Sequence, residues 1–141
     1  ADCSHIGCVA MALGVALRDT TPTQLHIGNA TINVEVVATE SARELGLSGR
    51  ASLPQNSGMW FVFDQDGVWG IWMKDMRFPL DIVYVDSGKN VATVYKNVSP
   101  DSYPEIFYPT NPARYVLELP AGFADAHDIV EGTPVIFDKT K

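Results

Sequence analysis

The sequence predicts a mainly β protein: an antiparallel β-sandwich or barrel with one or two short helices and an added N-terminal extended strand. Short apolar segments recur between turns rich in Gly, Pro, Asn and Asp, a spacing typical of antiparallel strands. With 141 residues, the chain is long enough for one domain that buries about two thirds of its unfolded surface. Apolar residues make up 46% of the chain and charged residues 19%, which indicates a well-filled core and excludes a disordered protein.

The first predicted elements of the domain are a hairpin and a short helix. Residues 24–27 and 31–37 are expected to pair about the turn 28–29, because apolar and polar side chains alternate along the second segment. The segment 18–23 contains a proline and is interpreted as a linker. A helix is expected over 39–45, because Ser41 and Glu44 have the spacing of a capping box and a glycine follows.

The other strands are predicted from short runs of β-branched and aromatic residues between turns: 59–63, 68–73, 80–85, 91–98, 115–119 and 133–137. The first two of these should pair through an Asp-Gly turn, and the next two through the turn 86–89. Residues 99–113 contain four prolines and are expected to form a long loop over the surface. One or two helical turns are expected within 123–130.

The N-terminal stretch 9–17 alternates without exception between bulky and small side chains. Its bulky residues are Val9, Met11, Leu13, Val15 and Leu17. A strand would place all five on one face, whereas a helix would distribute them around its axis. Burying them would contribute on the order of 10 kcal/mol before ordering costs. The pattern therefore predicts an apolar strand and linker over residues 1–23, followed by a single β domain over 24–141.

This strand has two interpretations. It can fold back on its own domain as an added sheet edge, or it can complete the sheet of a neighbouring copy, in which case head-to-tail donation builds a filament. The second interpretation makes residues 9–17 the self-association strand of a homo-oligomer.

Charge and composition limit the partners and the location. A net charge of −7 argues against a nucleic-acid partner, and no apolar run approaches the roughly 18 residues of a transmembrane helix. Cys3 and Cys8 could close a small disulfide loop or remain free thiols. Asn29 and Asn97 begin glycosylation acceptor triplets. Together these residues favour an extracellular or cell-surface protein.

Five motifs in order resemble the prokaryotic domain-of-unknown-function family DUF192. They are Gly46-Leu47-x-x-Arg50, Gly58-Met59-x-Phe61-x-Phe63, Trp72-Met73-Lys74, Pro79-Leu80-Asp81-Ile82 and Tyr115 to Gly122. The resemblance covers roughly residues 31–138 and leaves residues 1–30 outside the match. It implies a compact, mainly β fold, often secreted or membrane-tethered, and it implies no activity. The sequence departs from the family pattern at Ser48, where a Met is usual, and at 75–76.

Four charged residues within these motifs adjoin apolar sequence: Arg50, Lys74, Asp81 and Glu118. They could line a polar cleft that holds an anion or divides acid and base roles, or they could form an internal ion-pair network. The sequence shows no catalytic motif, no phosphate-binding loop, no cofactor motif and no metal-ligand spacing. Trp60, Trp69 and Trp72 could pack in the core or present a sugar-binding surface.

We therefore expect a non-catalytic extracytoplasmic domain that self-associates by donating its N-terminal strand, as a filament or surface-structure subunit. The alternative is a monomeric protein that binds a small molecule or a carbohydrate, or a hydrolase that uses the charged cleft. No cofactor and no metal are expected.

Overall fold

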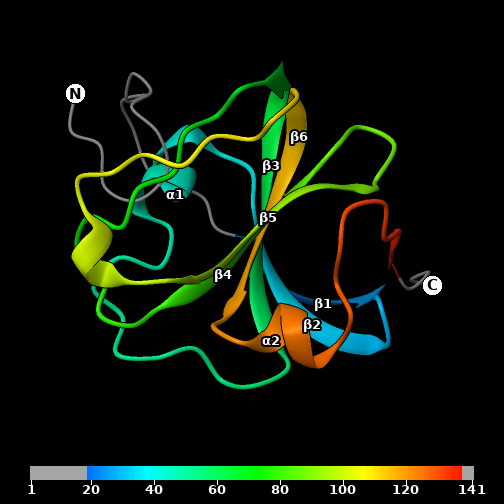
Figure 1. Ribbon diagram of the computed structural model, residues 1–141, viewed down its shortest axis with the longest axis horizontal. Coiled ribbons are helices and arrows are strands. Elements are labelled where there is room, and N and C mark those ends of the chain that lie inside the picture. Colours follow the sequence, from blue (N-terminus) through cyan, green and yellow to red (C-terminus); the bar gives the residue numbers. More distant parts are fainter. Residues whose placement is uncertain (1–18, 138–141) are drawn as a thin grey trace.

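A computed structural model describes residues 19–137 and confirms the predicted fold class: the chain is mainly β (Figure 1). Within these residues, seven strands form one curled sheet, a half-barrel, accompanied by two short α-helices and one 3-10 turn. The strands are β1 (Asp19–Ile27), β2 (Ala30–Val37), β3 (Ser57–Gly67), β4 (Leu80–Val85), β5 (Val91–Val98), β6 (Ala113–Pro120) and β7 (Val135–Phe137). The helices are α1 (Glu40–Leu45), η1 (Pro100–Ser102) and α2 (Phe123–Ala126).

The strand order is β5-β4-β6-β3-β2-β1-β7, and one pair departs from the predicted antiparallel arrangement. β2 and β3 are parallel, with Val34 opposite Gly58 and Val36 opposite Trp60. Parallel neighbours need a crossover connection, and residues 38–56 supply it with α1 inside it. This crossover places α1 against one face of the sheet (Figure 1).

The hairpins about 28–29 and 86–89 are confirmed, whereas the one expected between 59–63 and 68–73 is wrong. β3 continues through the expected turn as far as Gly67, and its antiparallel partner is β6. Residues 68–73 leave the sheet and touch the proline-rich loop through an isolated bridge between Ile71 and Phe107. The linker expected over 18–23 is also wrong from residue 19 onward, because β1 begins there.

The N-cap of helix α1 lies two residues before the expected capping box. The Thr39 side chain accepts the amide hydrogen bond of Ala42 at 3.2 Å and caps the helix. Gly46, with φ 50°, ends it as predicted.

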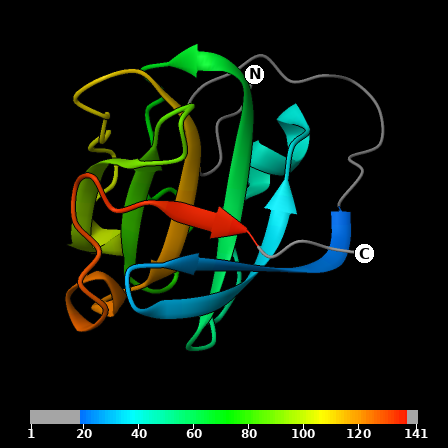
Figure 2. The same ribbon diagram turned by 90° about the vertical axis from the view of Figure 1, so that its right-hand side faces the viewer.

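The curled sheet has an inner and an outer face, each with its own apolar cluster. Every strand contributes to the inner cluster, and α2 covers one end of it; Figure 2 shows β1, β7 and α2 on this side. The edges of the sheet meet where Val91 N–H donates to Thr133 O and Val135 N–H donates to Lys89 O, both at 2.8 Å. The inner face is therefore enclosed and apolar.

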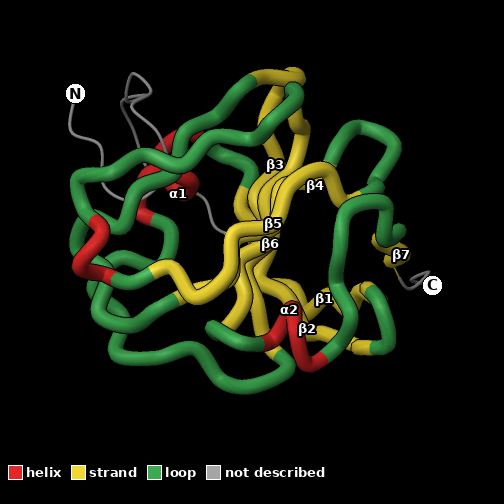
Figure 3. The backbone as a smooth tube through the Cα atoms, viewed as in Figure 1, coloured by secondary structure: helices red, strands yellow, loops and turns green. Residues whose placement is uncertain are grey.

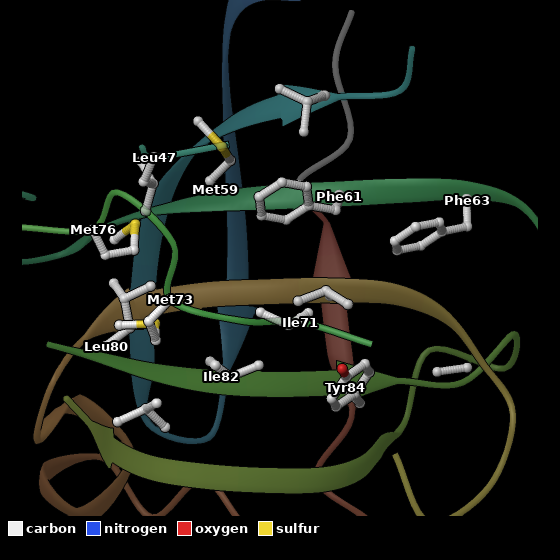
Figure 4. Close-up of a cluster of buried hydrophobic side chains, with 14 of the residues drawn as sticks. Leu47, Met59, Phe61, Phe63, Ile71, Met73, Met76, Leu80, Ile82 and Tyr84 are labelled. Carbon is white, nitrogen blue, oxygen red and sulfur yellow. The ribbon is translucent and has the colours of Figure 1, made fainter. Parts of the chain in front are cut away.

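Helix α1 and two loops cover the outer face, and Figure 3 shows them together on one side of the sheet. Met59, Phe61 and Phe63 of β3 face the segment that carries Ile71 and Met73, as Figure 4 shows. These loops lie outside the half-barrel, so their exposed side can vary without opening the inner cluster.

Candidate functional site

Side chains along a strand alternate between the two faces of the sheet, and this alternation separates the four charged residues expected from the sequence. Asp81 belongs to the inner face, at the end closed by α2. Its carboxylate is fully buried and accepts backbone hydrogen bonds from Asn97 at 2.8 Å, Gly122 at 3.2 Å and Ala124 at 2.8 Å. Two of these donors are at the start of α2, where amide groups have no partner within the helix. Asp81 therefore fastens α2 to the sheet.

Glu118 and Arg50 belong to the outer side. Glu118 is fully buried on β6, opposite Met59 of β3 and Ile82 of β4. Arg50 donates to the carboxylate of Glu35 at 3.0 and 3.2 Å. Glu35 is itself opposite Met59, so a methionine separates this ion pair from Glu118 in the row across the sheet.

Lys74 lies on the loop next to Arg50. Its backbone carbonyl accepts the Ser48 hydroxyl at 3.2 Å, and the amide of Gly49 donates to Asp75 O at 2.9 Å. The Lys74 ammonium is 5.9 Å from the centre of the Trp72 ring. The structure thus brings Arg50, Lys74 and Glu118 to the outer side and leaves Asp81 on the inner one.

A pocket of about 540 Å³ opens elsewhere on the outer side, between the start of α1 and the end of β3. We call it the α1 pocket; it is lined by Ala38, Thr39, Glu40, Arg43, Phe63, Asp64, Gln65 and Trp69. None of the four charged motif residues lines it. Thr39 caps the first turn of α1. Arg43 lies one turn further along the helix and points back toward the sheet.

Arg43 forms the buried base of the α1 pocket. Its side chain donates to Ala38 O at 2.6 Å and Val62 O at 2.8 Å, and the residue is only 5% exposed. Its Nε atom is buried and has no hydrogen-bond partner among the residues that the structure describes. Burial lowers the pKa of Arg43, while the negative charges of Asp64 and Glu40 act in the opposite direction.

Phe63 and Trp69 form the aromatic wall of the pocket. Their rings are stacked, with centroids 4.7 Å apart and an interplanar angle of 7°, and the Arg43 guanidinium carbon is 5.0 Å from the Phe63 centroid. The Trp69 indole N–H donates to Gln65 O at 3.2 Å. A Cβ on Gly67 would be 2.7 Å from the Trp69 ring, so the fold-back of Trp69 onto β3 depends on this glycine.

A second pocket of about 540 Å³ lies at the other end of α1, among Leu45, Ser48, Gly49, Asp75, Met76 and Arg77. It contains no aromatic side chain and no buried charged one. Within residues 19–137, no group of three His, Cys, Asp or Glu side chains could hold a metal ion.

The other residues expected from the sequence have different outcomes. Trp60 is in the inner cluster, 3% exposed and stacked on Tyr115 at 4.8 Å, which excludes it as a sugar-binding surface. The side chains of Asn29 and Asn97 are exposed, and their glycosylation stays a prediction. The strand 9–17 and the pair Cys3 and Cys8 lie outside the described residues.

The α1 pocket was not expected from the sequence. Its lining comes from residues 38–43 and 63–69, which only the β2–β3 crossover brings together. The available signal was the pair Phe63 and Trp69 on either side of a short polar turn.

Comparison with known proteins gives the family of this chain. The model of the DUF192 family (Uncharacterized ACR) matches residues 23–137, and the chain belongs to this family. The match begins at residue 23 rather than 31, so it includes most of β1. No curated protein matches the chain. Among the described residues, no helix is long and apolar enough to cross a membrane.

Two crystal structures share the fold. One is a candidate transcription regulator from Sinorhizobium meliloti 1021, with 27% identity, a TM-score of 0.78, and coverage of 84% of this chain and 95% of that one. The other is a protein of unknown function from Novosphingobium aromaticivorans DSM 12444, with 24% identity, a TM-score of 0.77, and coverage of 92% and 99%.

Proposed function

We propose that this member of the DUF192 family is a non-catalytic, extracytoplasmic binding domain that holds a neutral carbohydrate in the α1 pocket. One observation carries the proposal: the pocket combines the stacked rings of Phe63 and Trp69 with a buried guanidinium and two carboxylates. Its volume of about 540 Å³ falls within the range of small-molecule sites, roughly 300–1,000 Å³.

The charges of the lining favour a neutral ligand over an ionic one. Glu40 and Asp64 repel an anion, and the chain as a whole carries a charge of −7. Arg43 already places a cation over Phe63 and offsets one of the two carboxylates, which weakens the attraction of the lining for a cationic ligand. A polyhydroxylated ligand can accept from the guanidinium and donate to the carboxylates, while its C–H faces pack on aromatic carbon.

DNA binding does not fit this lining. The Sinorhizobium meliloti protein is named as a transcription regulator, and direct DNA binding in such a role would require clustered cations to neutralise phosphates, which the net charge of −7 opposes here. We therefore do not extend that function to this chain.

The proposal is tested by titrating the full chain with neutral sugars under isothermal calorimetry. The probes are glucose, galactose, mannose, N-acetylglucosamine and their linear oligomers. We expect at least one series to bind, and Asp64→Asn to weaken its binding at least tenfold because the rim loses a charged acceptor. Asp125→Asn, an exposed change on α2, is the matched control and should leave the affinity unchanged. Failure of all four series to bind would overturn the proposal.

Self-association through the strand 9–17 is the second candidate. The observation that favours it is that β1 begins at Asp19, so the alternating stretch is joined directly to a strand of the sheet. Leu13→Asp places a charge on the bulky face and should reduce the particle mass measured by light scattering, whereas Ser4→Asp should leave it unchanged. A monomeric wild-type protein would eliminate this candidate and the filament that follows from it.

A further inference from the structure

An exposed apolar surface lies beside the α1 pocket, on segments 68–72 and 103–108. We call it the aromatic platform and define it as Val68, Trp72, Tyr103, Ile106 and Tyr108. Within residues 19–137, seven large hydrophobic side chains are exposed, and four of them belong to the platform: Val68 at 54%, Tyr103 at 42%, Ile106 at 39% and Tyr108 at 47%. Exposed apolar side chains that gather in one region are typical of recognition surfaces.

The platform is held rigidly from below. Ile71 and Phe107 exchange two backbone hydrogen bonds, at 2.9 and 2.8 Å, which join its two segments. The buried Tyr84 hydroxyl lies 2.6 Å from Trp69 O and 2.8 Å from Phe107 O and shares its proton between them. The Tyr95 hydroxyl donates to Tyr108 O. A rigid aromatic surface loses little conformational entropy when a ligand binds.

The contacts of Gly70 bring the two halves of the platform into one surface. A Cβ on Gly70 would be 2.6 Å from Ile106 and 2.8 Å from the Tyr108 ring, so both side chains pack directly over this glycine. At the other end, the rings of Trp72 and Tyr103 meet edge to face with centroids 5.0 Å apart.

The platform adjoins the α1 pocket along the chain, at residues 69 and 70. Trp69 lines the pocket, and the next residue, Gly70, lies beneath Ile106 and Tyr108. A ligand that fills the pocket and extends past Trp69 therefore passes onto the platform.

We infer that the platform is a second subsite of the same site and that the ligand is a neutral glycan chain of several sugar units, which rests on the proposed function. The five side chains that define the platform are uncharged, and the two charged groups next to them, Glu105 within 103–108 and the Lys74 ammonium 5.9 Å from the Trp72 ring centre, are opposite in sign. The surface therefore complements an uncharged chain with aromatic faces and tyrosine hydroxyls. The overall charge of −7 disfavours an acidic polysaccharide.

The test compares single sugars with chains in the full-length protein. Cello-, malto- and chito-oligosaccharides of one to six units are titrated by isothermal calorimetry. We expect the affinity for the series that binds to rise at least tenfold from the monosaccharide to the tetrasaccharide. Tyr108→Ala and Tyr103→Ala should each lower the affinity for the tetrasaccharide at least fivefold and leave the affinity for the monosaccharide unchanged.

Ile136→Ala is the matched control, because Ile136 is 58% exposed and lies on β7, away from the platform. Its affinities should equal those of the wild type. An affinity that does not depend on chain length, with the monosaccharide still bound, would refute the platform and preserve the α1 pocket. Binding of no sugar at all would refute both. Platform variants that change only the particle mass in light scattering would also overturn the inference, because the surface would then join copies of the chain.

Discussion

Replacing Asp81 should cost a large share of the stability of this domain. In Asp81→Ala the amides of Asn97, Gly122 and Ala124 lose their acceptor, and that of Ala124 is buried. Each donor left unsatisfied costs about 1–3 kcal/mol, and water can reach the two partly buried ones, so we expect a loss of about 3–5 kcal/mol. Asp81→Asn keeps one acceptor oxygen and turns its amide NH2 group toward the remaining donors, so its loss should be about 2–4 kcal/mol.

Urea unfolding followed by tryptophan fluorescence measures both variants. The urea concentration at the unfolding midpoint should fall, with little change in the dependence of the unfolding free energy on urea, because the surface exposed on unfolding stays the same. Asp125→Asn, which removes the charge of the exposed partner of Lys96 on the same helix, should leave the urea midpoint close to that of the wild type. A loss below about 1 kcal/mol in Asp81→Ala would show that α2 does not depend on this carboxylate, and a functional role for Asp81 would have to be reconsidered.

The outer side offers two further predictions. Burial, with a smaller contribution from the charge of Glu118, raises the pKa of the Tyr84 hydroxyl, so the folded protein keeps this proton at a pH where the unfolded chain loses it. The contribution of Tyr84 to the free energy of unfolding is therefore fully present below about pH 10 and falls by about 1.4 kcal/mol per pH unit above it. Urea midpoints measured from about pH 8 to 12 should lack this part of the pH dependence in Tyr84→Phe. Gly70→Ala should lose about 1–3 kcal/mol, because its Cβ would collide with Ile106 and Tyr108, and should also weaken tetrasaccharide binding. Gly88→Ala, with no atom closer than 3.4 Å to the added Cβ, is the matched control; equal midpoints for the two alanine variants would contradict the packing described for the platform.

Local turn chemistry explains which parts of the fold the sequence could predict. The hairpins about 28–29 and 86–89 depend on a few adjacent residues, so their signals are complete within the turn. The parallel pairing of β2 with β3 and the pairing of β3 with β6 join distant segments, and no local signal records them. An Asp-Gly pair at the end of β3 therefore led to a wrong hairpin, although Gly67 has a definite role in seating Trp69.

The candidate site shows the same limit. Of the four charged residues that adjoin apolar sequence, Asp81 and Glu118 are fully buried. Burial, however, serves a structural purpose as readily as a functional one, and Asp81 satisfies backbone donors. The residues of the α1 pocket come from two segments whose proximity depends on the crossover, so reading along the chain could not assemble them.

The two faces of the sheet should make stability and binding separable in this protein. Asp81 acts on the inner side through α2, whereas Asp64 lines the α1 pocket and Tyr108 packs over Gly70 on the outer side. Sites without shared partners add their free energies within about 0.5 kcal/mol. The double variant of Asp81→Asn with Tyr108→Ala should therefore combine the unfolding cost of the first with the tetrasaccharide loss of the second, measured by urea unfolding and calorimetry below the unfolding transition. A coupling above about 1 kcal/mol in either measurement would mean that the inner cluster controls the geometry of the platform, and the binding surface could then no longer be treated as an independent addition to the half-barrel.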